Sequence, residues 1–199
     1  MGKSLEREYK TMIHSQDFIR LKEQDKFKLI NPIIQHNYYY DTEALNLKSL
    51  NAALRLRVFE NSSEWTLKIS KNQQDSIEIT DSVPHVILAP NSIDADTFEE
   101  PELLTFLIDN QISLTQFKQT HSFTTHRYIY QEQAYTWCLD ATNFPFVTDY
   151  ELECECHDIL SIEAWKEHLS RLGLSYHQAP TKIARASFYA QLFKKFHDQ

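Results

Sequence analysis

The sequence predicts a mainly β protein with flanking helices, arranged as an antiparallel barrel or a strongly curved sheet. About eight segments alternate polar and apolar residues with the period of two that is typical of strands. Helical patterns lie between and after these segments. The chain has 199 residues, of which 42% are hydrophobic, so a large core is possible. Because the sequence contains no repeat, low-complexity tract or linker, we expect one domain over residues 1–199.

Five of the expected strands lie in the first half of the chain, where β-branched and aromatic residues are frequent. They cover Leu5–Ile13, Ile33–Asp41, Ala53–Phe59, Glu64–Ser70 and Ser76–Val83. Polar triplets at Asn61–Ser63 and Asn72–Gln74 predict the hairpin turns that join the last three strands. Between the first two strands we expect a helix over Gln16–Lys28, with Ser15 as its N-cap.

The second half of the chain begins with a helical pattern over residues 90–111, where leucine and isoleucine recur at helical spacing. Three further strands are expected, at Gln116–Tyr130, Ala134–Ala141 and Val147–Cys156. A helix then begins after Ser161 and ends at Gly173. A last helix, capped by Thr181, covers Lys182–Phe196. Its aromatic residues Phe188, Tyr189 and Phe193 are expected in the core.

The formal net charge of −8 argues against a nucleic-acid or acidic-membrane partner, because such partners require a basic exterior. The N-terminus lacks the apolar run of a signal peptide, and no segment approaches the roughly 18 apolar residues of a spanning helix. Three cysteines do not make a paired disulfide framework. We therefore expect a soluble, cytoplasmic protein. The sequence does not indicate an oligomeric state.

Glycine is scarce, since Gly2 and Gly173 are the only two in the sequence. Folds that wrap phosphate in the backbone amides of a glycine-rich loop are therefore excluded, and any bound phosphate must be held by side chains. Other chemical motifs are also missing, because the sequence has neither an H-E-x-x-H zinc motif nor a G-x-S-x-G nucleophile elbow. Cys154 and Cys156 lie on the strand face opposite neighbouring glutamates, so we expect them to pack under a helix.

Charged residues occupy alternate positions in several expected strands, which gives each strand one charged face and one apolar face. These residues are Glu6, Glu8, Lys10, Arg55, Arg57, Lys68, Glu78, Asp140, Glu151, Glu153 and Glu155. In a single strand, exposure to water explains such a face. When the apolar faces of several strands lie beneath helices, the charged faces must line the enclosed side of a barrel. Burying an ionised group costs several kcal/mol unless it is paired or binds an ion, so we expect a water-filled, ligand-binding tunnel.

These residues resemble the CYTH domain family, also called the triphosphate tunnel metalloenzymes. The segment Glu6–Lys10 matches the family's E-x-E-x-K signature. Further matching blocks follow in family order to about residue 190. They are Tyr39–Thr42, Leu54–Arg57, Trp65–Lys68, Ile77–Ile79, Thr124–Arg127, Leu139–Asp140, Tyr150–Glu153 and Thr181–Arg185. The sequence departs from the family at Phe146–Asp149 and His121–Phe123, where many members have a glycine.

The resemblance implies a closed tunnel of eight antiparallel strands that binds a short polyphosphate. Family members include inorganic triphosphatases, thiamine triphosphatases, RNA 5′-triphosphatases and class IV adenylate cyclases. Since no appended second domain is visible, the chain is most similar to the bacterial stand-alone members. The implied metal is Mg²⁺ or Mn²⁺, which prefer carboxylate oxygens and water as ligands.

The resemblance also implies roles for individual residues. The candidate metal ligands are Glu6, Glu8, Asp140, Glu151 and Glu153. The candidate phosphate-binding residues are Lys10, Arg55, Arg57, Lys68, Arg127, Lys182 and Arg185. Two residues are candidates for catalysis: Lys10 contacts the attacking water or the Tyr39 hydroxyl, and Glu78 orients a basic residue or accepts a proton. An internal ion pair is an equally good interpretation of Glu78, and Glu155 is expected to be a structural or rim charge.

We expect the protein to hydrolyse inorganic triphosphate to pyrophosphate and phosphate. One metal ion would hold the phosphates and a second would orient or activate the attacking water. Three other enzymatic activities remain open: thiamine triphosphatase, nucleoside triphosphatase and class IV adenylate cyclase. A further alternative is a non-catalytic module that binds polyphosphate or a nucleotide. The complete set of carboxylates argues against that module, because binding an anion requires only the basic residues.

Overall fold

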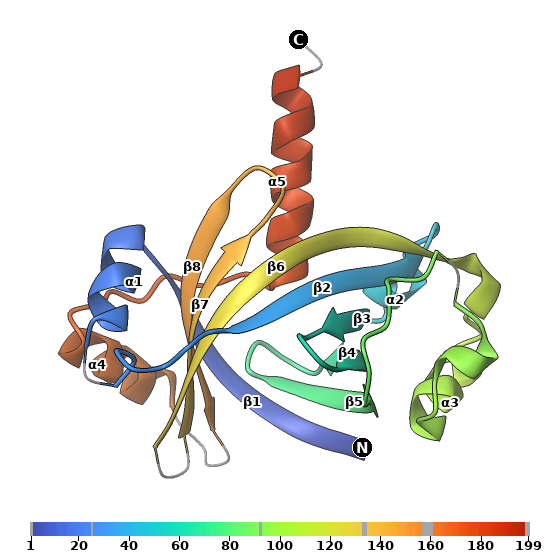
Figure 1. Cartoon of the computed structure of the whole chain (residues 1–199), viewed down its shortest axis with the longest axis horizontal. Coiled ribbons are helices and arrows are strands. Elements are labelled where there is room, and N and C mark those ends of the chain that lie inside the picture. Colours follow the sequence, from blue (N-terminus) through green and yellow to red (C-terminus); the bar gives the residue numbers. More distant parts are fainter. Residues whose placement is uncertain (1, 25, 92, 133–134, 157–160, 198–199) are drawn as a thin grey trace. The chain divides into compact units, whose positions relative to one another are not determined.

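The computed structural model describes the chain except for residues 1, 25, 92, 133–134, 157–160 and 198–199. Its described residues form eight strands that close into a barrel in the order β1-β5-β4-β3-β2-β6-β7-β8 (Figure 1). The described registers are antiparallel, which confirms the predicted fold class. The strands are β1 Gly2–Ile13, β2 Ile33–Thr42, β3 Ala52–Val58, β4 Ser63–Ser70, β5 Asp75–Val83, β6 Phe117–Glu132, β7 Tyr135–Asn143 and β8 Thr148–Cys156.

The predicted strand boundaries agree with the observed ones to within three residues. The predicted start of the seventh strand, Ala134, lies outside the described residues. The chain divides into two compact units, one formed by residues 1–6 and 35–122 and the other by residues 7–34 and 123–199. The prediction of a single domain over residues 1–199 stays a prediction.

In the first unit, the apolar faces of β3, β4 and β5 pack beneath helices. Leu54 and Leu56 of β3 and Leu67 of β4 are completely buried, as the period-two pattern requires. They form one core with residues of α2 (Asn46–Ser49) and α3 (Pro101–Asp109). The charged residues of the same strands therefore lie on the face opposite this core.

The predicted helix over residues 90–111 is wrong in its first half. A single 3₁₀ turn at Ala95–Thr97 precedes α3, which begins only at Pro101. Proline disfavours helical geometry in the residue before it, and Glu100 is accordingly extended. The Glu100 side chain accepts a hydrogen bond from the Glu102 amide, which caps the helix.

The short helix α2 was not predicted, and it depends on Asp41. The Asp41 carboxylate accepts hydrogen bonds from the backbone amides of Thr42, Leu47 and Lys48 at 2.7, 3.0 and 3.0 Å. Because these amides lie at the start of α2 and just before it, the side chain satisfies donors that would otherwise be buried without partners. Asp41, which belongs to one of the family-like blocks, therefore has a structural role here.

In the second unit, β7 and β8 pack beneath α1 (Ser15–Lys22) and α4 (Ile162–Arg171). Figure 1 shows these two helices together on one side of the strands. Trp165 and Leu169 of α4 are completely buried and share a core with Cys154 and Cys156. This confirms that the two cysteines pack under a helix. None of the three cysteines, all of which are described, forms a disulfide.

The helix predicted over Gln16–Lys28 is too long, because α1 ends at Lys22. The Gln24 amide bonds to the Leu21 carbonyl three residues earlier, and the chain then continues in turns. These turns bury Phe27 against Tyr130. Ser15 is also not the N-cap, since it is the first helical residue and His14 precedes it.

The last two helices begin as predicted and end within two residues of the predicted positions. The Ser161 hydroxyl accepts from the Ala164 amide at 3.1 Å, and Gly173 follows α4 with a φ of 69°. Thr181 caps α5 (Lys182–His197). The core prediction for Phe188 is wrong: its side chain is 59% exposed, because it lies on the outer face of α5. Within the described residues, every helix is too short or too polar to cross a membrane.

Candidate functional site

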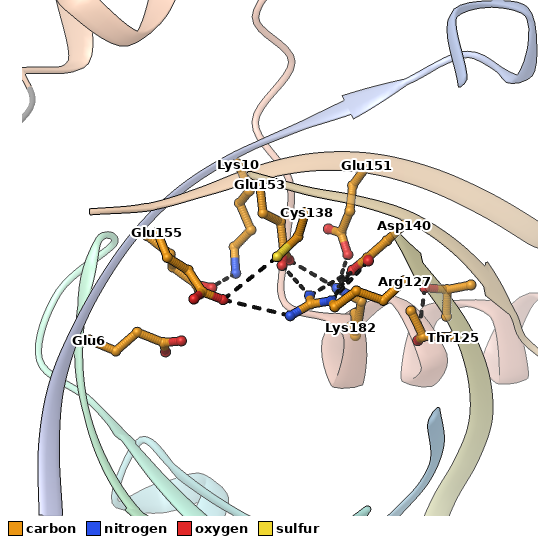
Figure 2. Close-up of polar contacts among 12 residues, drawn as sticks. Glu6, Lys10, Thr125, Arg127, Cys138, Asp140, Glu151, Glu153, Glu155 and Lys182 are labelled. Carbon is orange, nitrogen blue, oxygen red and sulfur yellow. Dashed lines mark hydrogen bonds and ion pairs between the residues drawn. The ribbon is translucent and has the colours of Figure 1, made fainter. Parts of the chain in front are cut away.

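The strand register of the second unit brings its charged residues together. Directly opposed residues in neighbouring antiparallel strands share a face. Arg127 of β6 is opposite Asp140 of β7, and Asp140 is opposite Glu151 of β8. Lys10 of β1 is opposite Glu153 of β8. Figure 2 shows these side chains gathered on the same face of the sheet.

Three carboxylates form the centre of this group. Asp140, Glu151 and Glu153 are 0%, 1% and 3% exposed. One oxygen from each lies within 4.8 Å of the others, so the three could hold one metal ion. Three buried negative charges at this spacing repel one another strongly and are stable only with cations between them.

The side chain of Lys182 provides one such cation from the first turn of α5. Its Nζ lies 2.8 Å from Asp140 Oδ2, 2.9 Å from Glu153 Oε1 and in contact with Glu151 Oε1 (Figure 2). Burial alone would lower the pKa of Lys182, but the three carboxylates outweigh burial and raise it. The ammonium group therefore lies among the three carboxylates with its positive charge retained.

Arg127 provides the second cation. Its guanidinium lies 2.7 Å from Asp140 Oδ2 and 3.6 Å from Glu155 Oε1, and it also pairs with Glu153 Oε2. Lys10 lies beside Glu8, with 2.6 Å between its Nζ and Glu8 Oε1. Burial would lower the pKa of Lys10, but the surrounding glutamates raise it. Glu155, which was expected to be a structural or rim charge, thus shares Arg127 as an ion-pair partner with Asp140 and Glu153.

The two central glutamates differ in acidity. Burial raises the pKa of Glu151, and its cationic neighbours do not fully offset this effect. Burial would also raise the pKa of Glu153, but Lys182, Arg127 and Lys10 hold it well below its usual value. The charged form of Glu153 is therefore favoured by its cationic neighbours, whereas burial disfavours the charged form of Glu151.

Arg185 occupies the far side of Glu151 and is only 5% exposed. Its Nε and Nη2 donate to the two oxygens of Asp149 at 2.7 and 3.3 Å. Its Nη1 donates to Glu151 Oε2 at 3.0 Å and to the Pro180 carbonyl at 2.6 Å. The guanidinium is thus bound by protein oxygens on three sides.

This second-unit cluster contains charges of both signs. Its described ion pairs join six carboxylates with four cations, so carboxylates outnumber cations among them. The carboxylates are those of Glu8, Asp140, Asp149, Glu151, Glu153 and Glu155, and the cations are Lys10, Arg127, Lys182 and Arg185. A bound cation would offset negative charge in this cluster.

The cluster also fits a metal chemically. Within the described residues, the buried Glu151 Oε1 accepts no hydrogen bond, although it meets the Lys182 ammonium as an ion pair. That ammonium shows that a positive group fits among the three carboxylates. Because the donor atoms are all carboxylate oxygens, the set suits a hard cation such as Mg²⁺ or Mn²⁺.

The first unit contains a second charged cluster, in which three cations face three glutamates. Arg57 Nη1 lies 2.9 Å from Glu64 Oε1, and Arg55 Nη2 lies 3.8 Å from the same oxygen. Lys68 Nζ pairs with Glu6 Oε2 and lies 3.2 Å from Glu78 Oε1. Burial would raise the pKa of Glu78, but Lys68, Arg55 and Arg57 lower it. In the described ion pairs of this first-unit cluster, each of the three cations lies within 4 Å of a glutamate oxygen.

The predicted site residues therefore fall into two groups. The second unit brings together Glu8, Lys10, Arg127, Asp140, Glu151, Glu153, Lys182 and Arg185. The first unit brings together Glu6, Arg55, Arg57, Lys68 and Glu78. Glu6 and Glu8, only two residues apart, belong to different units.

The sequence reasoning missed several members of these clusters, among them Glu64 and Asp149. Glu64 shares the strand face of Thr66 and Lys68, and Asp149 shares that of Glu151 and Glu153. Extending the alternation by one step toward the start of each strand would have included both residues. Cys138, two residues before Asp140, was missed for the same reason, and its Sγ lies 3.9 Å from Glu155 Oε1.

Comparison with known proteins agrees with this geometry. The sequence model of the CYTH domain matches residues 4–187. The comparison with curated proteins found no match. A candidate adenylate cyclase from Bacillus halodurans has a similar structure, with 26% sequence identity and a TM-score of 0.75. The similarity covers 93% of this chain and 98% of that chain.

Two more distant structures share the fold. A candidate adenylyl cyclase from Hippeastrum, which has a dominant triphosphatase activity, is 21% identical with a TM-score of 0.73. The similarity covers 92% of this chain and 94% of that chain. A protein from Pyrococcus horikoshii is 19% identical with a TM-score of 0.60, covering 89% of this chain and 96% of that chain.

Proposed function

Because the chain belongs to the CYTH family, whose enzymes hydrolyse triphosphates in a metal-dependent reaction, we propose that it hydrolyses inorganic triphosphate to pyrophosphate and phosphate. One observation carries this proposal: three buried carboxylates surround a single position that accepts a cation. A module that only binds an anion would have no use for Asp140, Glu151 and Glu153. A separate group of arginine and lysine side chains is available for the phosphates.

We propose that Asp140, Glu151 and Glu153 hold the metal, with Glu6 and Glu8 as further ligands. When bound, a divalent ion would neutralise phosphate oxygens and help to orient the attacking water. The close grouping of three buried carboxylates and their hard oxygen donors support this assignment. Mg²⁺ and Mn²⁺ are the proposed ions.

We propose that lysine and arginine side chains bind the phosphate chain. The proposed contacts are Lys10, Arg55, Arg57, Lys68, Arg127 and Lys182. Arginine suits bidentate contacts with phosphate oxygens, whereas lysine acts as a compact point charge. Phosphoryl transfer depends mainly on positioning and on charge stabilisation, which these side chains provide without forming a covalent intermediate.

We propose that the two candidate catalytic residues, Lys10 and Glu78, act in their charged forms. The raised pKa of Lys10 favours a hydrogen-bond donor that orients water or phosphate, and it disfavours a general base. The lowered pKa of Glu78 and its 3.2 Å distance to Lys68 favour a carboxylate that orients this lysine. Glu78 would then not accept a proton during the reaction.

The main alternative is an organic triphosphate as substrate, including cyclisation of ATP. The names of the Bacillus halodurans and Hippeastrum relatives motivate this alternative, and the triphosphatase activity of the Hippeastrum protein supports the proposal. Thiamine triphosphate and nucleoside triphosphates are the other substrates to compare. The choice among them depends on how much room the site leaves for an organic group.

The decisive experiment is a phosphate-release assay with triphosphate, pyrophosphate, ATP and thiamine triphosphate, each with Mg²⁺, Mn²⁺ or a chelator. Glu151→Gln and Glu153→Gln should lower kcat strongly while the proteins remain folded. Glu167→Gln is the matched control, because Glu167 is exposed and pairs only with Arg171 among the described contacts. Turnover that persists in chelator, or full activity of both variants, would exclude the metal assignment. Preferential turnover of ATP or thiamine triphosphate would favour the alternative.

A further inference from the structure

Arg185 was expected to bind phosphate, but its hydrogen bonds indicate another role. A guanidinium has five N–H donors, and four hydrogen bonds to protein oxygens use most of them here. The bidentate pair with Asp149 is the strongest arrangement that arginine forms with a carboxylate. To contact a phosphate, Arg185 would have to break this pair and leave Asp149, which is 8% exposed, buried without its partner.

Asp149 is itself fixed by a second residue of α5. The Tyr189 hydroxyl donates to Asp149 Oδ2 at 3.0 Å. Tyr189 follows Arg185 by four residues, so both side chains leave the same face of the helix. The ring of Phe144 lies 5.9 Å from the centre of the guanidinium and covers it. Arg185 is therefore held by Asp149 and Phe144 in addition to its contact with Glu151.

Arg185 also donates a hydrogen bond to Glu151. The two carboxylate oxygens of Glu151 are used differently: Oε2 accepts from Arg185, whereas Oε1 faces Lys182 and the other central carboxylates. A hydrogen bond to one oxygen fixes the rotation of the carboxylate and therefore the direction in which the other oxygen points. Residues that orient a metal ligand in this way strongly affect metal affinity.

We propose that Arg185, held by Asp149 and Tyr189, is a positioning residue that orients Glu151 toward the cation and does not bind the phosphate chain. This inference rests on the proposed function, because it assumes that Glu151 is a metal ligand. The inference assigns different roles to the two basic residues of the Thr181–Arg185 segment. Lys182 faces the cation position, and Arg185 supports the carboxylate from behind.

The substitution Asp149→Asn distinguishes the two roles by which affinity it changes, that for triphosphate or that for the metal. If Arg185 binds phosphate, removing the charge of Asp149 makes the guanidinium more available and strengthens triphosphate binding. If Arg185 positions Glu151, the same substitution loosens Glu151 and weakens metal binding. Tyr189→Phe removes one hydrogen bond from the same group and should have a smaller effect in the same direction. Both variants are nearly isosteric, so the chain should still fold.

The experiment measures two affinities by calorimetry: Mn²⁺ alone, and triphosphate in the presence of chelator. We expect Asp149→Asn and Arg185→Lys to weaken Mn²⁺ binding about tenfold and to leave triphosphate affinity unchanged. Arg57→Met, a proposed phosphate contact, should weaken triphosphate binding. Tyr40→Phe is the structural control, because its hydroxyl also donates a partly buried hydrogen bond, to the Pro90 carbonyl at 3.0 Å in the first unit. It should lower Tm without changing Mn²⁺ affinity.

Two results would overturn the inference about Arg185 and leave the proposed metal site unaffected. One is wild-type Mn²⁺ affinity in the Asp149, Tyr189 and Arg185 variants. The other is a loss of triphosphate affinity in Arg185→Lys that matches the loss in Arg57→Met. A wild-type protein that binds no Mn²⁺ would overturn the proposed metal site and the inference with it, so the two failures are distinguishable. If Arg185→Lys does not fold, Asp149→Asn and Tyr189→Phe decide the question.

Discussion

The contact between Lys182 and the three central carboxylates leads to a prediction about stability that does not depend on turnover. The ammonium group lies where a metal bound by Asp140, Glu151 and Glu153 would lie. In the absence of metal, Lys182 should stabilise the fold by offsetting their negative charge. Lys182→Met keeps the length of the side chain but removes the charge. We expect this variant to melt at a lower temperature in chelator and to recover when Mn²⁺ is added.

The size of the effect follows from the contacts that remain. Removing one partner of a buried ion pair costs about 3–5 kcal/mol. Arg127 still contacts Asp140 and Glu153, and Arg185 still contacts Glu151, so a loss near the low end, about 3 kcal/mol, applies here. For a chain of this length, 1 kcal/mol shifts Tm by about 2–4 °C. The expected decrease in chelator is therefore about 6–12 °C.

Added metal should reverse most of this decrease. A ligand present at a hundred times its Kd stabilises the folded state by about 2.7 kcal/mol. The wild-type protein should gain less than the variant, because its ammonium group must leave the cation position before the metal can bind. The assay is thermal melting of both proteins in chelator and at several Mn²⁺ concentrations. Lys194→Met, an exposed lysine on the same helix, is the control and should resemble the wild type.

The reasoning would be refuted by equal stabilisation of wild type and variant across the Mn²⁺ series. That result would mean that Lys182 and the metal do not compete for one position. An unchanged Tm of Lys182→Met in chelator would equally contradict the role of the ammonium in the metal-free protein.

Two further predictions concern positions outside the metal site. Burial would raise the pKa of Glu78, but its cationic neighbours lower it below its ordinary value of 4.5. Its contribution to stability should thus be present above pH 4.5 and be lost as the pH falls further, so Glu78→Gln should flatten the decrease of Tm in acid. At Gly173, whose φ is 69°, Gly173→Ala should destabilise the protein by about 1–2 kcal/mol. Denaturant unfolding measures this loss, and an unchanged midpoint would contradict the argument from backbone geometry.

Most of the strands, and the division of each strand into two faces, could be predicted from the sequence. Alternation placed Arg55 and Arg57 opposite Leu54 and Leu56, and both leucines are completely buried. The helices were predicted less accurately. The apolar pattern of residues 103–108 was extended back across Pro101, although proline disfavours helical geometry in the preceding residue, Glu100. Phe188 was misplaced because an aromatic residue indicates burial only when another element covers it.

The sequence by itself determined which side chains share a face, because alternation along a strand is a local property of the backbone. Only the tertiary structure decided which charges meet. The strand register placed Asp140 beside Glu151, and the position of α5 brought Lys182 and Arg185 to opposite sides of that glutamate. The role of Arg185 depends on Asp149, 36 residues away in the chain. Such a pairing depends on how separate elements pack, and no local pattern in the sequence encodes it.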